Sequence, residues 1–172
     1  MSCRSKIGSA ETVWSPPSRG FVKFNVDGEA KSDVAGCLGV MRTKSGVVTS
    51  MFAGPLPSFG SDYAELMAIN TALEIFINDN WIGKAGLIVE SGSKVELNWI
   101  LKPSKKSCCW WPMFLDIDGM VQRIEHVKKK KIVCISVKKW DGRLILAFLQ
   151  FWLVGWDFAL YCIATGSSSY HY

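Results

Sequence analysis

The stretch that decides the fold is FVKFNVDGEA, residues 21–30. Within it, Val22, Phe24 and Val26 alternate with polar or charged residues that end at Asp27. A period of two places the two sets on opposite faces of an extended chain, so the pattern predicts a strand with one apolar face. Asp27 is followed by Gly28, and an isolated Asp-Gly pair is more often a solvated strand end and turn than a functional pair.

Two more predicted strands follow directly. They are AGCLGVMR (35–42) and GVVTSMFAG (46–54), and the turn-forming residues 43–46 separate them. Short strands joined by tight turns predict an antiparallel meander.

The next segments predict helices and one more strand. SDYAELMAINTALEIFINDN (61–80) has apolar residues at helical spacing, with Glu65 in the first turn, where a carboxylate suits the helix dipole. AGLIVE (85–90) is typical of a buried strand, and SKVELNWIL (93–101) of a second helix. The order predicts an α/β fold: a mixed central sheet that contains the three-strand meander and carries flanking helices.

Composition sets the wider limits. With 49% hydrophobic and 20% charged residues in 172, the chain can bury one core, and the composition argues against wholesale disorder. The net charge of +5 suits a partner with a phosphate backbone without specifying one. The six cysteines form no Cys-x-x-Cys pair and the only histidines are His126 and His171, so a zinc site has little to build on. Residues 1–18 are polar and lack a signal-peptide pattern, which predicts a cytoplasmic or nuclear protein.

Three fragments together carry a family resemblance. They are WSPPSRGFVKFNVDGEA (14–30), SDYAELMAINTALEI (61–75) and GLIVESGSKVELNWI (86–100). In this order they resemble the plant, reverse-transcriptase-like branch of the ribonuclease H family, over roughly residues 14–127. The resemblance implies a ribonuclease H-like fold and Mg²⁺-dependent hydrolysis of the RNA strand of RNA–DNA hybrids, with a carboxylate cluster holding the ions.

The resemblance also assigns the candidate catalytic and metal-binding residues. It makes Asp27 the central ligand and Glu65 the second. The third acid of the family stands just after the fourth strand, in a pattern like Glu-Ser-Asp-Ser, where this chain has Gly92. Glu90 is not an obvious replacement, because the family commonly has an acid there too. An incomplete ligand set predicts weak or absent cleavage.

The fourth family acid is missing from the C-terminal part. It normally follows a strand beginning His-Val-Lys-Arg, which HVKKKK (126–131) resembles, but no Ala-Asp follows here. Residues 139–144, read one base later, can encode Asn-Gly-Met-Ala-Asp-Ser. We hypothesise that the tail derives from a shifted reading frame; a transcript and gene without that alternative reading would remove the idea.

Other acids and His126 have ordinary interpretations that compete with functional ones. Asp116 and Asp118 could replace the lost ligands, but a solvated helix face is favoured. Asp141 follows Trp140 in a segment of doubtful register. His126 is interpreted as a strand residue of ordinary packing.

The last third of the chain leaves several alternatives open. The lysine run 128–131 either contacts phosphates or is simply solvated. Three tryptophans either stack on bases or are stray apolar residues; they are Trp110, Trp111 and Trp140. Residues 144–164 could span a bilayer, pack on the sheet as misread family sequence, or remain poorly ordered. We therefore expect a polar segment (1–18), a ribonuclease H-like domain (19–127) and an aberrant tail (128–172). We also expect the protein to be a monomer.

Three functions remain open at this point. The first is a magnesium-dependent hybrid ribonuclease, impaired in this copy. The second is a non-catalytic module that binds nucleic acid. The third is an inactive remnant of a mobile element.

Overall fold

A computed structural model describes residues 14–102, 108–128 and 133–137. Several predictions fall on other residues and so lie outside the described part of the chain. These are the shifted reading frame, Asp141, Trp140, His171, the lysines at 129–131 and the apolar run 144–164. Among the described residues, no helix combines the length and the apolar character that crossing a membrane requires.

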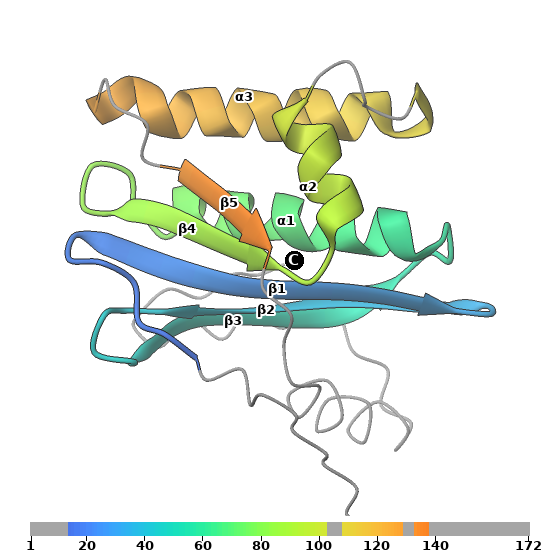
Figure 1. The fold of residues 1–172 in the computed structure, drawn as a ribbon, viewed down its shortest axis with the longest axis horizontal. Coiled ribbons are helices and arrows are strands. Elements are labelled where there is room, and N and C mark those ends of the chain that lie inside the picture. Colours follow the sequence, from blue (N-terminus) through green and yellow to red (C-terminus); the bar gives the residue numbers. More distant parts are fainter. Residues whose placement is uncertain (1–13, 103–107, 129–132, 138–172) are drawn as a thin grey trace, which may run out of the picture.

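A five-stranded mixed sheet forms the centre of the molecule (Figure 1). Its strands are β1 (Phe21–Lys31), β2 (Val34–Arg42), β3 (Val48–Leu56), β4 (Gly86–Ser91) and β5 (Val133–Val137). The spatial order is β3-β2-β1-β4-β5. β1, β2 and β3 pair antiparallel, whereas β4 pairs parallel with both β1 and β5. The predicted mixed sheet with an antiparallel meander is confirmed.

The described helices cover one face of this sheet (Figure 1). They are α1 (Ser61–Asn78), α2 (Lys94–Leu101) and α3 (Trp111–Lys128), the last preceded by a short 3-10 turn, η2 (Cys108–Trp110). α1 packs directly on β1 and β2, and α3 packs on α1. The parallel connection from β1 to β4 runs through α1, as parallel strands require a crossover.

The prediction that His126 lies in a strand is wrong. His126 is exposed near the end of α3, which continues to Lys128. The physical reason is that apolar residues keep helical spacing along the segment, from buried Phe114 and Ile117 to buried Ile124. The strand that follows is β5, and its pairing with β4 carries the sheet past residue 127.

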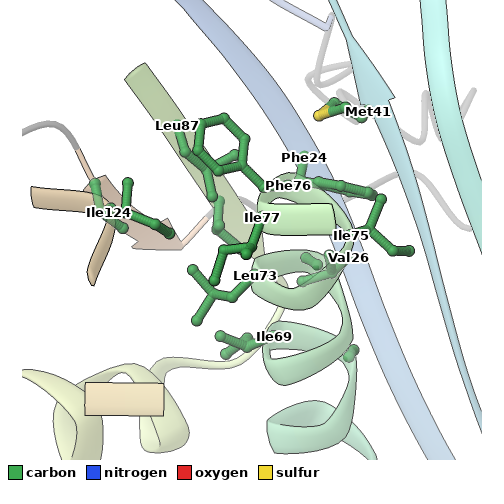
Figure 2. Packing of buried hydrophobic residues seen from close by; sticks show 14 of the residues in the cluster. Phe24, Val26, Met41, Ile69, Leu73, Ile75, Phe76, Ile77, Leu87 and Ile124 are labelled. Atoms are coloured by element: carbon green, nitrogen blue, oxygen red, sulfur yellow. The ribbon is translucent and has the colours of Figure 1, made fainter. Parts of the chain in front are cut away.

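The core lies between the apolar face of the sheet and α1 (Figure 2). Alternation along β1 supplies its sheet side, and every third or fourth residue of α1 supplies its helix side. Burial of each large side chain contributes about 1.5–3 kcal/mol, which is enough to fix α1 on the sheet. The fully buried members include Phe24, Val26, Leu66, Ile69, Leu73, Phe76 and Leu87.

Gly28 marks the point of closest approach between β1 and α1. A Cβ at this position would lie 2.2 Å from the carbonyl carbon of Ala64 and 2.4 Å from the backbone nitrogen of Glu65. Backbone atoms of a packed helix cannot yield to such a contact. Only glycine therefore allows the first turns of α1 to lie this close to β1.

Substitution of Gly28 by alanine should destabilise the protein by at least about 2 kcal/mol, because the added methyl group would push α1 away from β1. Thermal unfolding followed by circular dichroism measures the change. Gly119→Ala is the matched control: its Cβ meets nothing within 4 Å, and it lies in α3. Alanine there should stabilise by up to about 1 kcal/mol. Equal effects of the two substitutions would contradict the close approach.

Candidate functional site

The site lies where β1 runs past the end of β4. These strands are parallel, and the last paired positions are Val26 and Ser91. One residue further along each chain stand Asp27 and Gly92. The close approach at Gly28 brings the start of α1, with Glu65, to the same place. Three elements that are distant in sequence thus meet at one end of the strand pair.

Both predicted metal-binding acids converge on Gly92. A Cβ on this glycine would lie 3.4 Å from Asp27 Oδ1 and 3.7 Å from Glu65 Oε1, which are ordinary van der Waals distances. Gly92 is exposed, so a side chain there has access to solvent as well as to the two acids. The structure therefore brings Asp27, Glu65 and the position of Gly92 together.

Ser91 holds Glu65 in place. Its side chain is fully buried, and its hydroxyl donates to Glu65 Oε2 at 2.9 Å. The same hydroxyl oxygen accepts from the backbone N–H of Ser93 at 3.2 Å. This pair of contacts connects the end of β4, the start of α2 and the site acid. Ser91 was not among the predicted site residues. It lies two residues after the buried Val89 in β4, however, so strand geometry predicts that both side chains face α1.

Burial and like charge dominate the electrostatics of the pair. Burial raises the pKa of Glu65 to about 8, and the negative charges of Asp27 and Glu96 add to this effect against the opposing hydrogen bond from Ser91. Burial also raises the pKa of Asp27, although a hydrogen bond with Glu65 opposes the rise. Both acids are therefore harder to ionise than an exposed carboxyl group.

A further acid, Glu96, approaches the site from α2. Its side chain is only 2% exposed. Burial, and then the hydrogen bond and negative charge of Asp62, raise its pKa to about 7. The sequence pattern does not single out Glu96, because it resembles an ordinary first-turn residue of a predicted helix. The signal that could have found it is the spacing Ser93-x-x-Glu96, which places the acid beside the helix start.

Glu90 faces a different environment. Its Oε1 accepts from Lys23 Nζ and its Oε2 from Asn25 Nδ2, each at 2.7 Å. The ion pair is buried, with the Lys23 residue 4% and the Glu90 residue 8% exposed. Alternation along β4 explains this placement, because Glu90 and Ser91 point to opposite faces of the sheet. Both Glu90 oxygens are thereby engaged by Lys23 and Asn25.

The remaining candidates lie on or next to α3. Asp116 is exposed and Asp118 half-buried there, as a helix face in contact with solvent. Trp110 packs against Tyr63, with ring centroids 5.0 Å apart, and Trp111 is 49% exposed. Across residues 14–102, 108–128 and 133–137, no three Asp, Glu, His or Cys side chains are already arranged to hold a metal ion.

Comparison with known proteins identifies the family. The family described as reverse transcriptase-like matches residues 25–132, a span that includes Asp27, Glu65 and Gly92. The chain belongs to this family. Its domain is ribonuclease H-like, as the fold and the solved structures below show. No curated protein sequence matches the chain at a significant level.

Solved ribonuclease H structures share the fold. LC11 ribonuclease H1, isolated from compost by a metagenomic approach, is 16% identical with a TM-score of 0.58, over 77% of this chain and 91% of that one. The N-terminal ribonuclease H domain of a Mycobacterium tuberculosis protein is 13% identical with a TM-score of 0.55, over 74% and 92%. The prototype foamy virus protease-reverse transcriptase is 17% identical with a TM-score of 0.56, over 76% of this chain and 19% of that one.

The raised pKa of Glu65 predicts the pH dependence of stability without divalent cations. The folded state keeps a proton that the unfolded state releases near the ordinary pKa of 4.5. The stability contributed by Glu65 is therefore complete below 4.5 and is lost as the pH rises through about 8. Melting temperatures measured in EDTA across this range should fall with rising pH.

Glu65→Gln should make this fall shallower, because the amide cannot ionise. Glu74→Gln, at an exposed position of the same helix, should leave the slope unchanged. A slope that Glu65→Gln does not alter, in a protein that keeps its circular dichroism spectrum, would show that Glu65 ionises freely in the folded chain.

Proposed function

We propose that this ribonuclease H-like domain binds RNA–DNA hybrids and cleaves their RNA strand only weakly, through a divalent cation held by Asp27 and Glu65. The observation that carries the proposal is the convergence of both carboxylates on a glycine, where a side chain would contact each of them. The site keeps two acids in contact and lacks an acid at the position between them.

The donor chemistry of the site fits a hard divalent cation such as Mg²⁺, which takes carboxylate oxygens. Two buried acids in contact repel each other once ionised, and a cation would relieve that repulsion more fully than a shared proton does. Such an ion, when bound, supplies an activated water and stabilises the leaving oxygen of a phosphodiester. Ser91 contributes by fixing the orientation of Glu65 through its buried hydroxyl.

Two observations support a nucleic-acid partner. The net charge of +5 favours association with a polyanion. A solved neighbour with the same fold, LC11 ribonuclease H1, was determined in complex with an RNA/DNA hybrid, with 17% identity and a TM-score of 0.53. The proposal of weak cleavage follows from Gly92, since a ligand missing from a metal site lowers the affinity for the ion and the preorganised charge stabilisation.

Gly92→Asp should raise Mg²⁺-dependent cleavage of a fluorescent RNA–DNA hybrid by roughly 10²-fold, the size of effect that one preorganised group has on a charged transition state. The backbone accepts a side chain here, because the added Cβ makes only ordinary contacts. Gly92→Asn is the matched control: it has nearly the same size and no charge, and should give a far smaller increase.

The same variant has a second readout that is independent of turnover. A third acid beside two others should lower the melting temperature in EDTA and enlarge the rise on adding Mg²⁺. Cleavage and Mg²⁺-induced stabilisation that both stay at the level of the unsubstituted protein, in a folded Gly92→Asp variant, would overturn the assignment of Asp27 and Glu65 as cation ligands.

Hybrid binding should depend strongly on salt. Fluorescence anisotropy in EDTA, where no cleavage occurs, should show log K falling linearly with log salt concentration, because each phosphate contact releases condensed counterions. Asp27→Asn should retain this binding or strengthen it slightly, since it removes a negative charge facing the phosphates. Absence of binding at low salt would instead favour an inactive remnant.

A further inference from the structure

Glu96 presents a buried oxygen that no hydrogen bond satisfies. The residue is 2% exposed, and its Oε2 has no hydrogen-bond partner. Buried carboxylate oxygens in native proteins are nearly always paired, because an unpaired one loses its hydration without compensation. An orphaned oxygen at this depth therefore points to a ligand that the protein binds there.

Helix capping does not account for Glu96. The spacing Ser93-x-x-Glu96 is that of a capping box, in which the acid would accept from the backbone N–H of Ser93. That N–H donates to Ser91 Oγ instead, at 3.2 Å. The hydroxyl of Ser93 still caps α2 by accepting from the backbone N–H of Val95. The partner that a capping glutamate would use is thus already taken.

The groups that face Glu96 come from the first turns of α1. Asp62, which is exposed, makes a hydrogen bond with the Glu96 carboxyl. α2, which carries Glu96, packs against α1, which carries Glu65. Glu96 therefore lies beside the helix that supplies one acid of the pair at Gly92, on α2 rather than at the end of β4.

We propose that Glu96 supplies the third carboxylate for the divalent cation held by Asp27 and Glu65, in the place of the acid that Gly92 does not provide. This inference rests on the proposed function. The described residues hold no ready-made set of three ligands, so Glu96 turns from Asp62 toward Glu65 when the ion binds. The movement breaks the hydrogen bond between the Glu96 carboxyl and Asp62, and the ion would satisfy the unpartnered Oε2.

The test is Mn²⁺ binding to the full chain, measured by isothermal titration calorimetry in parallel with melting temperatures in EDTA. Glu96→Gln should weaken Mn²⁺ binding about tenfold or more, the range that lost metal-site contacts typically cost. The same variant should melt at a higher temperature in EDTA, because an amide removes a buried charge. An acid that is buried for structural reasons alone gives the rise in melting temperature with unchanged Mn²⁺ affinity, and that result would overturn the inference.

Two further variants test whether the effect is specific to Glu96. Glu29→Gln is the matched control, because Glu29 is exposed and its charge acts on Asp27 from outside the site; it should change Mn²⁺ affinity less than twofold. In a Gly92→Asp background, Glu96→Gln should cost much less affinity than in the unsubstituted chain, since the third acid is then present. Equal losses in both backgrounds would contradict a substitute role.

Failure of this inference is distinguishable from failure of the proposed function. Asp27→Asn should abolish Mn²⁺ binding at this site. If Asp27→Asn abolishes binding while Glu96→Gln does not weaken it, the cation site stands and the role of Glu96 is wrong. If neither substitution affects binding, the cation site itself is wrong, and the inference about Glu96 is lost with it.

Discussion

The absence of a side chain at Gly28 is the constraint on which the site depends. Because backbone meets backbone there, the start of α1 lies against the end of β1, and the residues next to the contact are Asp27 on the strand and Glu65 on the helix. A wider separation would leave two unrelated acids at the ends of two elements. The hydrophobic core between α1 and the sheet keeps the helix in this position, since Phe24 and Phe76 are fully buried in it.

Holding the acids together has a cost that the surroundings only partly offset. Burial raises the pKa of both Asp27 and Glu65, and the negative charge of Asp27 adds to the rise at Glu65. The hydroxyl of Ser91 favours the ionised form of Glu65, but it is a single neutral donor. At Glu90, by contrast, Lys23 neutralises the carboxylate directly. The fold thus neutralises Glu90 with its own lysine. The negative charge of the Asp27–Glu65 pair is left to be neutralised by protons or by a cation.

The sequence predicted the sheet, α1 and the meeting of Asp27, Glu65 and Gly92, because strand alternation and the three family fragments are local signals. Its failures came from long-range or ambiguous patterns. The segment at His126 resembled a family strand, whereas the apolar spacing of α3 carries the helix through it. Glu96 was missed because helix patterning does not reveal that Ser91 takes the N–H that a capping acid would use. The burial of an acid depends on such competition, which a single sequence does not display.

The geometry around Gly92 also explains why we place the proposed third acid on α2 rather than on β4. Strand alternation turns Glu90 to the face of Lys23 and Asn25, so no rotamer change in β4 brings that acid to Glu65 without breaking a buried ion pair. Ser91 faces the site but carries a hydroxyl, which orients Glu65 and adds no charge. The next acid along the chain is Glu96, one helical turn past Gly92, and α2 returns it to the side of α1. In the proposed arrangement, an acid on α2 would approach these carboxylates from a different direction, so a glycine at the end of β4 would not by itself leave the cation without a third carboxylate.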